Sequence, residues 1–397
     1  MKESKLEIIR KYDLCDNCIG RLISDKKIDY EKIAKNLRKG KNLKKTDIIN
    51  CYLCQGLLSE IEKFTKLILK ELTKFDFDTF LIGTKIDEDI LSKENKINKL
   101  LKNENINYLK NEINRELGLI LEKKLDKVVN FERPDIMVIL DTQFDNINFQ
   151  IQSLFIYGRY KKYSRKIPQT KWYCKICKGK GCRDCNYKGT KYNKSVEELI
   201  AKDFLKETKS DLESFHGAGR EDIDVKMLGT GRPFIIELKD PKKRKIDLKI
   251  LEEKINSKNK KYIEISNLRF SNREEVVKIK NSKYKKVYEV TIKSEKALNI
   301  EKLKKVAQSL QGKTINQKTP CRVAHRRADL LRKKKIYSCQ IKQLEGTISK
   351  LVVEAESGTY IKELINGDKG RTKPNISDLL NTPCVVKTLD VIEIKGE

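Results

Sequence analysis

The sequence predicts an α+β protein in which a domain built on a central antiparallel sheet follows a smaller α/β region. Three observations lead to this fold class. Short apolar runs with strand-like alternation recur along the chain, stretches with apolar residues three and four apart lie between them, and paired cysteines occur in two groups. With 397 residues, of which 38% are hydrophobic, the chain can form two or three domains with packed cores.

The chain is strongly basic. It contains 87 Lys and Arg against 57 Asp and Glu, a formal net charge of +30, and the basic residues are spread along the whole length. Such a surface attracts polyanions, and binding weakens with salt because counterions are released. Nucleic acid is therefore the expected partner, although solvated helix faces in a Lys-rich composition account for part of the excess.

The amino terminus has no apolar run long enough for a signal peptide, and no segment approaches the roughly 18 apolar residues of a membrane span. We therefore expect a cytoplasmic protein without a membrane partner. In that compartment a disulfide framework is not expected, so the spacing of the 11 cysteines indicates metal sites or buried thiols.

The first region, residues 1–57, contains two CxxC pairs separated by a polar, helix-compatible stretch. Two such pairs can bind one tetrahedral Zn²⁺ through four thiolates. We expect a structural zinc site in which all four positions are filled and metal binding is coupled to folding. The alternative is four small core residues at coincidental spacing. The ligands would be Cys15, Cys18, Cys51 and Cys54.

Residues 58–167 are predicted to form a second region. An amphipathic helix over residues 55–75 leads into it, and strands then alternate with charged helical stretches between residues 87 and 128. This alternation is typical of a small α/β domain. The strands are expected at residues 79–86, 135–140 and 147–156.

A second cysteine cluster occupies residues 168–190. Its two pairs are four residues apart, and Gly179 and Gly181 permit the turns that bring four sulfurs around one ion. We expect a second zinc site, with a reduced ribbon or a pair that completes some other site as the alternatives. The ligands would be Cys174, Cys177, Cys182 and Cys185.

Three aromatic residues flank this cysteine knuckle among Lys and Arg: Trp172, Tyr173 and Tyr187. Aromatic rings interleaved with basic residues can stack on unpaired nucleotides. The same rings can instead pack the small ribbon, and the sequence leaves both interpretations open.

Residues 191–397 are predicted to form the largest region. Ser195 and Glu198 make a capping-box pattern at the start of an apolar-periodic helix. Strands and helices then mix at a density that predicts an α+β domain on a central antiparallel sheet. The strands are expected near residues 234–238, 262–266, 288–292, 346–354 and 384–394, and the helices near residues 300–310 and 360–365.

Four motifs in this region identify a family by their order and spacing. They are Gly219-Arg220-Glu221-Asp222 with the GTGRPF run after it, Lys286-Val287-Tyr288, residues 317–331 (QKTPCRVAHRRADLL) and residues 357–364 (SGTYIKEL). Together they resemble the pseudouridine synthases, and most closely the Pus10 family of tRNA-modifying enzymes from archaea and eukaryotes. The amino-terminal cysteine module and residues 195–200 (SVEELI) fit the same pattern. The resemblance also implies a THUMP-type RNA-binding domain in residues 58–167.

Formation of pseudouridine breaks the bond between N1 of uracil and C1′ of ribose and rejoins the ring through C5. No catalytic cofactor is implied, in agreement with the lack of a P-loop or a GxGxxG fingerprint in the sequence. The resemblance places the essential carboxylate at Asp222, either as the nucleophile on C1′ or as the base that removes the 2′ proton. Glu221 occupies the variable place of the motif, and strand alternation is expected to point Asp224 away.

The resemblance also assigns the substrate-binding residues. An isolated loop carboxylate needs a cation to hold it, and Lys362 is the implied partner, as a point charge where Arg is commoner. Leu364 is implied to line the base pocket. Tyr288 is implied to stack on the target base and to help move the C5 proton, although a core residue of a strand is the alternative. Tyr360 is the second implied aromatic contact, and Arg220 is implied to hold the RNA loop open.

A basic run over residues 322–335 fits the grip on the backbone that an extruded base requires. Its apolar residues, among them Val323 and Leu331, fit equally well an ordinary helix with a solvated basic face. His216 and His325 make a catalytic histidine pair conceivable, but no hydrolase-like spacing in the sequence supports one.

We therefore predict a cofactor-independent isomerase that acts on the TΨC arm of tRNA, with uridine 55 as the implied target and uridine 54 as a second candidate. One alternative is a noncatalytic zinc-dependent RNA-binding factor. Another is a THUMP-containing enzyme of different chemistry, such as a methyltransferase or a thiolase, which the missing glycine-rich nucleotide loop disfavours.

Overall fold

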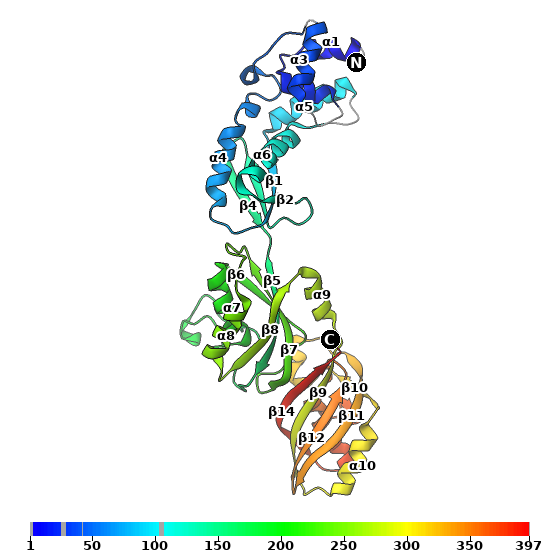
Figure 1. The fold of residues 1–397 in the computed structure, drawn as a ribbon. Coiled ribbons are helices and arrows are strands. Elements are labelled where there is room, and N and C mark those ends of the chain that lie inside the picture. Colours follow the sequence, from blue (N-terminus) through cyan, green and yellow to red (C-terminus); the bar gives the residue numbers. More distant parts are fainter. Residues whose placement is uncertain (1–2, 25–28, 42, 103–106, 397) are drawn as a thin grey trace. The chain divides into compact units, whose positions relative to one another are not determined.

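The computed structural model describes residues 3–24, 29–41, 43–102 and 107–396, and the chain forms two compact units (Figure 1). The first unit consists of the chain up to Ser153 together with Lys239–Lys245. The second consists of Leu154–Leu238 together with the chain from Ile246 onward.

The beginning of the first unit is helical. Cys15 caps the amino terminus of α2 in an extended conformation, and Cys18 is buried within that helix. Cys51 and Cys54 follow a short 3-10 turn and are buried as well. The elements are α1 (Glu3–Arg10), α2 (Asp16–Ile23), α3 (Tyr30–Lys41) and the 3-10 turns η1 (Ile48–Asn50) and η2 (Leu57–Ser59).

The rest of the first unit is an α/β structure, as predicted. Its sheet has the order β2-β1-β3-β4, in which β1 is parallel to both neighbours and β3 is antiparallel to β4. The helix expected from residue 55 begins only at Ile61, because Gly56 adopts a left-handed conformation and a 3-10 turn follows it. The elements are α4 (Ile61–Leu72), β1 (Thr79–Lys85), α5 (Glu88–Leu101), α6 (Leu109–Leu125), β2 (Val128–Val129), β3 (Ile136–Asp141) and β4 (Asn146–Ile151).

One hydrophobic core joins the cysteine module to the α/β part. It extends from Ile9 to Leu140 and includes the four cysteines. A buried ion pair between Arg21 of α2 and Glu94 of α5 adds a polar link between the two parts. The boundary expected at residue 57 therefore does not separate two compact bodies, since neither part buries its apolar surface without the other.

The second unit is built on a ten-stranded sheet of order β13-β10-β11-β12-β9-β14-β7-β5-β8, with β6 paired to β7. The registered pairs are antiparallel except for β14 with β7, which confirms the predicted sheet type. The strands are β5 (Leu154–Lys162), β6 (Leu212–Gly217), β7 (Lys226–Lys239), β8 (Ile263–Ser271), β9 (Lys285–Ser294), β10 (Thr314–Lys318), β11 (Leu331–Glu345), β12 (Ile348–Ala355), β13 (Thr372–Lys373) and β14 (Cys384–Lys395).

The helices of the second unit pack on this sheet, with α8 against β8, α10 against β11 and α11 against β14. The predicted cap is confirmed, since the Ser195 hydroxyl accepts a hydrogen bond from the Glu198 amide at 3.2 Å. The elements are η3 (Arg183–Cys185), α7 (Val196–Thr208), α8 (Leu248–Asn259), α9 (Arg273–Asn281), α10 (Ile300–Leu310), η4 (Cys321–Arg326), α11 (Ile361–Asn366) and α12 (Ile376–Leu380).

The strand expected at residues 147–156 is two strands that belong to different units. β4 ends at Ile151, and β5 begins at Leu154 and pairs with β7 and β8 of the second sheet. The chain therefore enters the second unit before the boundary expected at residue 167. Alternation shows that a segment is a strand but not which sheet it joins, because both sheets bury the same kinds of side chain.

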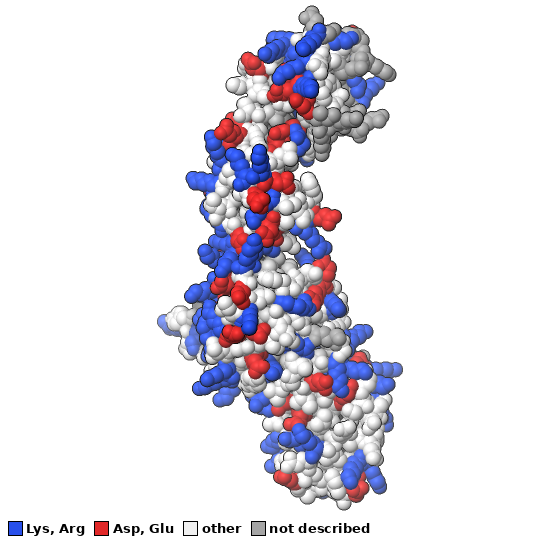
Figure 2. Space-filling view, in the orientation of Figure 1, with Lys and Arg blue, Asp and Glu red and all other residues white. Residues whose placement is uncertain are grey.

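Basic side chains are spread over both units on the face seen in Figure 2, with acidic side chains between them. This distribution agrees with the charge pattern of the sequence. Within the described residues no helix is both long and apolar enough to cross a membrane.

Candidate active site

Asp222 lies in the loop that joins β6 to β7. A turn closed by the Val225 amide on the Asp222 carbonyl, at 3.1 Å, shapes the loop. Gly219 has a φ of +84°, and a Cβ at this position would lie 2.9 Å from Lys286 Nζ. Glycine meets both constraints. Because this segment is a loop, the strand alternation that was expected to point Asp224 away does not apply.

Lys162 of β5 fixes the backbone of this loop from inside the unit. Its fully buried ammonium donates to the carbonyls of Asp222 at 3.1 Å, Ile223 at 2.9 Å and Ile167 at 3.1 Å. Burial lowers the pKa of Lys162 to about 8. The lysine thus stabilises one conformation of the backbone at Asp222 and Ile223 and ties it to Ile167. Nothing in the sequence distinguishes it from the many other lysines.

Glu221, next to Asp222, belongs to a buried network. Its carboxylate accepts a hydrogen bond from Arg232 Nε at 2.9 Å and from the Tyr160 hydroxyl at 2.9 and 3.0 Å. Arg232 also donates to the carbonyl of Ala218 at 2.8 Å. The variable residue of the motif is therefore structural in this chain. Because Glu221 is fixed in the interior, the position of its neighbour Asp222, which lines the cavity, is fixed as well.

A cavity of about 260 Å³ opens beside Asp222. This volume is at the small end of ligand pockets and suits one extruded base better than a dinucleotide cofactor. Five predicted site residues line it together: Arg220, Asp222, Tyr288, Tyr360 and Lys362. The sequence motifs meet at this place, although Arg220 and Lys362 are 142 positions apart in the chain.

The predicted residue Leu364 does not line the cavity. Its side chain is fully buried in the core of the second unit, on the inner face of α11. Ile361, one turn earlier, reaches the cavity in its place. Other apolar groups along the wall are Val225, Val323, Leu389 and Val391.

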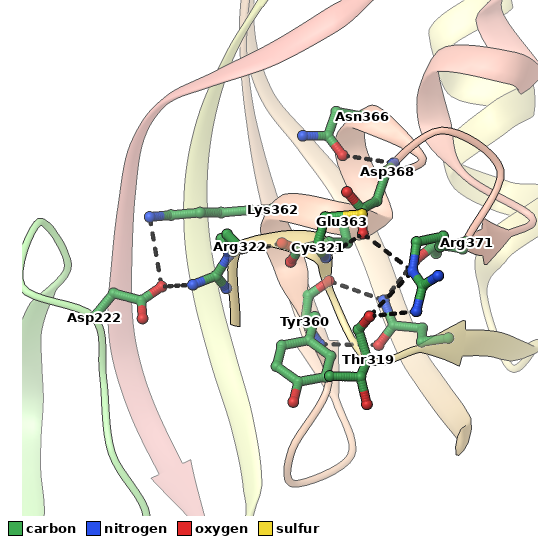
Figure 3. A network of polar contacts seen from close by, with 12 residues as sticks. Asp222, Thr319, Cys321, Arg322, Tyr360, Lys362, Glu363, Asn366, Asp368 and Arg371 are labelled. Atoms are coloured by element: carbon green, nitrogen blue, oxygen red, sulfur yellow. Dashed lines mark hydrogen bonds and ion pairs between the residues drawn. The ribbon is translucent and has the colours of Figure 1, made fainter. Parts of the chain in front are cut away.

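Two cations hold the Asp222 carboxylate, and the nearer is not the one predicted (Figure 3). Arg322 Nη1 lies 2.8 Å from Asp222 Oδ2, whereas Lys362 Nζ lies 3.5 Å from the same oxygen. Lys362 makes its shorter contact, 2.7 Å, with Asp224. Although burial acts in the opposite direction, the contact with Lys362 keeps the pKa of Asp224 below its usual range.

Arg322 is itself anchored. Its Nε donates to Glu363 Oε1 at 2.7 Å, and the Glu363 side chain is only 4% exposed (Figure 3). The guanidinium thus bridges a buried carboxylate and Asp222 with two different nitrogens, a geometry that an ammonium group cannot reproduce. The sequence marked Arg322 only as one residue of a basic run.

The two predicted tyrosines lie on different elements. Tyr288 is in the middle of β9 and nearly buried, and burial raises the pKa of Tyr288 to about 12. Tyr360 precedes α11, where the Gln317 side chain bonds both its amide and its carbonyl at 2.9 Å. Its hydroxyl lies 3.2 Å from Arg327 Nη1. Both rings are therefore held at the cavity by their backbones.

Arg220 lies at the edge of the cavity, with its guanidinium carbon 5.3 Å from the centre of the Trp172 ring. This contact brings the base of the cysteine knuckle to the active-site loop. The contact between Arg220 and Trp172, which lies 48 positions earlier, could not have been located from the sequence.

The basic run is not a helix. Its first part is the 3-10 turn η4, and its second part is the beginning of β11. Within β11, Leu331 is exposed and Ile336 is buried, because strand geometry turns alternate side chains to opposite faces. Val323 of η4 is buried, and Leu330, which precedes β11, is exposed. No histidine pair forms in the described residues: His216 contacts Glu237 at 3.0 Å, and neither His216 nor His325 lines the cavity.

Eight of the 11 cysteines form two tetrads, and within each tetrad the sulfur atoms all lie within 4.8 Å of one another. Neighbouring sulfurs are 3.8 Å apart in the first tetrad (Cys15 to Cys54) and 3.8 to 3.9 Å apart in the second. A tetrahedral ion with Zn–S bonds of about 2.3 Å requires sulfurs about 3.8 Å apart. Both tetrads therefore fit a four-coordinate metal ion, with the first tetrad buried and the second mostly half-buried.

Lys286, on the same strand as Tyr288, is a buried charged residue that is expected to lower the free energy of unfolding of the second unit. It lines the cavity, is 7% exposed, and its ammonium makes no ion pair or hydrogen bond with any residue that the structure describes. Burial, followed by the charge of Arg232, lowers the pKa of Lys286 to about 7. The unfolded chain, with an ordinary pKa near 10.4, then binds more protons than the folded chain between pH 7 and pH 10.

Lys286→Met is therefore expected to stabilise the second unit by roughly several kcal/mol at pH 6.5, and by much less at pH 9.5. Urea unfolding of the variant and of the wild type at the two pH values measures the difference. Lys285→Met, an exposed neighbour on β9, is the control and should show no such pH dependence. A stabilisation that is equal at both pH values would contradict the assigned protonation.

Comparison with known proteins decides the family. Residues 155–395 match the family described as Pus10, C-terminal, and residues 64–141 match the archaeal Pus10 THUMP domain. The tRNA pseudouridine synthase Pus10 of Methanocaldococcus jannaschii is 42% identical over 98% of this chain and 93% of its own length. The chain belongs to the Pus10 family. The Pus10 proteins of Methanosphaera stadtmanae and Pyrococcus furiosus are 38% and 34% identical, each over 99% of this chain.

Membership of the Pus10 family confirms the resemblance that the motifs indicated, together with the THUMP domain in the first unit and the synthase domain in the second. Its relatives are named as enzymes that form pseudouridine in tRNA. The alternatives of a noncatalytic binding factor and of a methyltransferase or thiolase find no support among them.

Proposed function

We propose that this chain isomerises uridine to pseudouridine in the TΨC arm of tRNA, at position 55 and in part at position 54, and that Asp222 is the catalytic carboxylate. The observation that carries the proposal is the position of Asp222, at a cavity of one-base size and between two cations. The choice of arm and position follows from the family likeness of the motifs. With tRNA as its substrate, the enzyme would work in the cytoplasm.

In this mechanism the target uridine leaves its stack and enters the cavity, where Tyr288 and Tyr360 offer aromatic faces. Asp222 then either attacks C1′ and displaces uracil at N1, which forms an ester, or removes the 2′ proton while the N1–C1′ bond breaks, which forms a glycal. After the ring has turned, C5 bonds to C1′, and this step releases the Asp222 carboxylate from the ester or returns the proton to C2′ of the glycal. The proton on C5 then passes to a base and is released to water, and N1 takes up a proton from water. Arg322 holds the Asp222 carboxylate in one direction, which a freely rotating loop side chain would not achieve.

The experiment is tritium release from tRNA transcripts labelled at C5 of uracil, without any added cofactor. The wild-type protein is expected to release tritium from a full transcript. Release should fall strongly when uridine 55 is replaced by cytidine, and the remainder should disappear when uridine 54 is replaced as well. Full release from the doubly replaced transcript would overturn the proposed target.

We infer that the ions are Zn²⁺, because four thiolates in a closed tetrahedral set are its typical structural environment. Cys15, Cys18, Cys51 and Cys54 would hold the first ion and the second tetrad the other. Zinc would supply cross-links within the fold and no step of the reaction. Catalysis itself is proposed to need no cofactor.

Removal of the first ion is expected to unfold the first unit, since four cysteines of its core would become unpaired thiols. Structural zinc contributes on the order of 10 kcal/mol of apparent binding free energy, which is as large as the stability of a domain. Cys51→Ser should lower the zinc content by one equivalent and abolish the thermal transition of this unit. Cys339→Ser, a buried cysteine outside both tetrads, should retain all the zinc.

A further inference from the structure

The knuckle formed by residues 172–190 presents three large apolar side chains to solvent. Tyr173 is 60% exposed, Ile176 is 67% exposed and Tyr187 is 73% exposed. A ribbon that used these side chains as its own core would bury them, since exposed apolar surface is unfavourable in water. Tyr173 and Tyr187 therefore do not form the core of the ribbon, since most of the surface of each side chain is exposed.

Backbone contacts and the cysteines close the knuckle instead. Tyr173 and Thr190 form an isolated β-bridge, and the Cys174 amide donates to the Gly189 carbonyl at 2.8 Å. The sulfurs of the second tetrad lie within 4.8 Å of one another, with Cys174 buried and the other three cysteines half-buried. The exposed side chains are thus not needed for closure, which leaves them to contact another molecule.

Basic residues outnumber acidic ones in the segment that carries the exposed side chains. Between Cys174 and Gly189 the chain has five basic residues and a single acidic one, Asp184, and all of them are exposed. A zinc ion with four thiolates would add two negative charges, and the segment would remain positive. The basic residues are Lys175, Lys178, Lys180, Arg183 and Lys188.

The base of the knuckle contacts the active-site loop. Trp172 lies under the guanidinium of Arg220, 5.3 Å from its carbon, and packs edge-on against Tyr192 at 5.5 Å. Arg220 in turn lines the cavity with Asp222. The knuckle belongs to the segment before α7, which projects from the second unit as a loop (Figure 1).

We propose that the knuckle is a stacking platform for unpaired nucleotides of the tRNA that neighbour the uridine in the cavity. This inference rests on the proposed function. Extrusion of one base removes a stacking partner from its neighbours, and aromatic faces can replace that partner without regard to sequence. The lysines and Arg183 would contact the phosphates, a role that fits a polyanion and not an apolar protein surface.

The test uses the full chain with zinc bound and a tRNA transcript that carries 2-aminopurine beside the target uridine. Tyr173→Ala and Tyr187→Ala are each expected to weaken tRNA binding by roughly five- to a hundredfold, and Tyr187→Phe to restore it. Wild-type protein should quench the 2-aminopurine fluorescence and the double Ala variant should not. At saturating tRNA the rate of tritium release should remain close to that of the wild type, so that KM changes and kcat does not.

Two further variants sharpen the test. Phe270→Ala removes a ring that is 50% exposed on β8 of the same unit, and it should leave both binding and quenching unchanged. Replacing Lys175, Lys178 and Lys180 by Ala should reduce the slope of log K against log salt concentration by roughly two.

The proposal would be overturned if the double tyrosine variant, with its zinc content and thermal unfolding intact, bound tRNA as tightly as the wild type. That result would point to a protein partner for the exposed rings. If the wild-type protein binds tRNA and quenches the probe but releases no tritium, the proposed function is wrong, whereas the stacking platform is supported. The two failures are therefore distinguishable.

Discussion

Asp222→Asn is expected to reduce the rate of pseudouridine formation by roughly a thousandfold or more, while tRNA binding stays close to that of the wild type. The substitution keeps the size of the side chain and its place between Arg322 and Lys362, but it removes the negative charge. An amide can neither attack C1′ as a carboxylate does nor accept the 2′ proton, so either mechanism predicts the same loss. Single-turnover tritium release at saturating enzyme measures the chemical step directly.

The matched control for this prediction is Asp224→Asn. Asp224 lies in the same loop and contacts the same Lys362, at 2.7 Å, but it is more exposed than Asp222 and does not line the cavity. Its loss should affect the rate far less. A thousandfold loss in Asp224→Asn, with an active Asp222→Asn enzyme, would reverse the two assignments.

The second large effect is expected from Arg322→Lys, which should lower kcat by roughly a hundredfold with little change in KM. Surface ion pairs usually contribute little, but Arg322 is fixed from behind by Glu363, whose side chain is almost completely buried. A lysine cannot reach both carboxylates with two separate donors. Asp222 would then move within its loop, and displacements of about one ångström are enough for losses of this size.

Lys362→Met and Glu363→Gln separate this role from a general loss of positive charge. Lys362 is farther from Asp222 than Arg322 is, so its removal should cost less activity than Arg322→Lys. Gln at position 363 still offers an oxygen to Arg322 Nε, so this variant should retain most of the activity. If Lys362→Met proved the more damaging substitution, the nearer contact of Arg322 would not be the one that positions Asp222.

Sequence patterns predicted well those elements that depend on interactions between neighbouring residues. The periodicity over residues 300–310 coincides with α10, and Ser195 caps α7 through the amide of Glu198, because spacing and capping depend on a few neighbouring residues. The tetrads were equally visible, since two CxxC pairs bring their own turns. The sequence could not exclude an ordinary helix for the basic run, because its apolar residues fit helix and strand alike; the pairing of β10 and β12 with β11 shows that its second part is a strand.

The sequence by itself determined the family, the α+β class, the cysteine tetrads and five of the residues that line the cavity, because short motifs and their spacing carry this information. Only the tertiary structure decided the partners of these residues. Arg322 displaces Lys362 as the nearest cation of Asp222, Ile361 replaces Leu364 at the cavity, and buried Lys162 holds the loop. Such pairings depend on small differences in distance between segments far apart in the chain, such as 2.8 Å against 3.5 Å for Arg322 and Lys362, and no local sequence pattern encodes them.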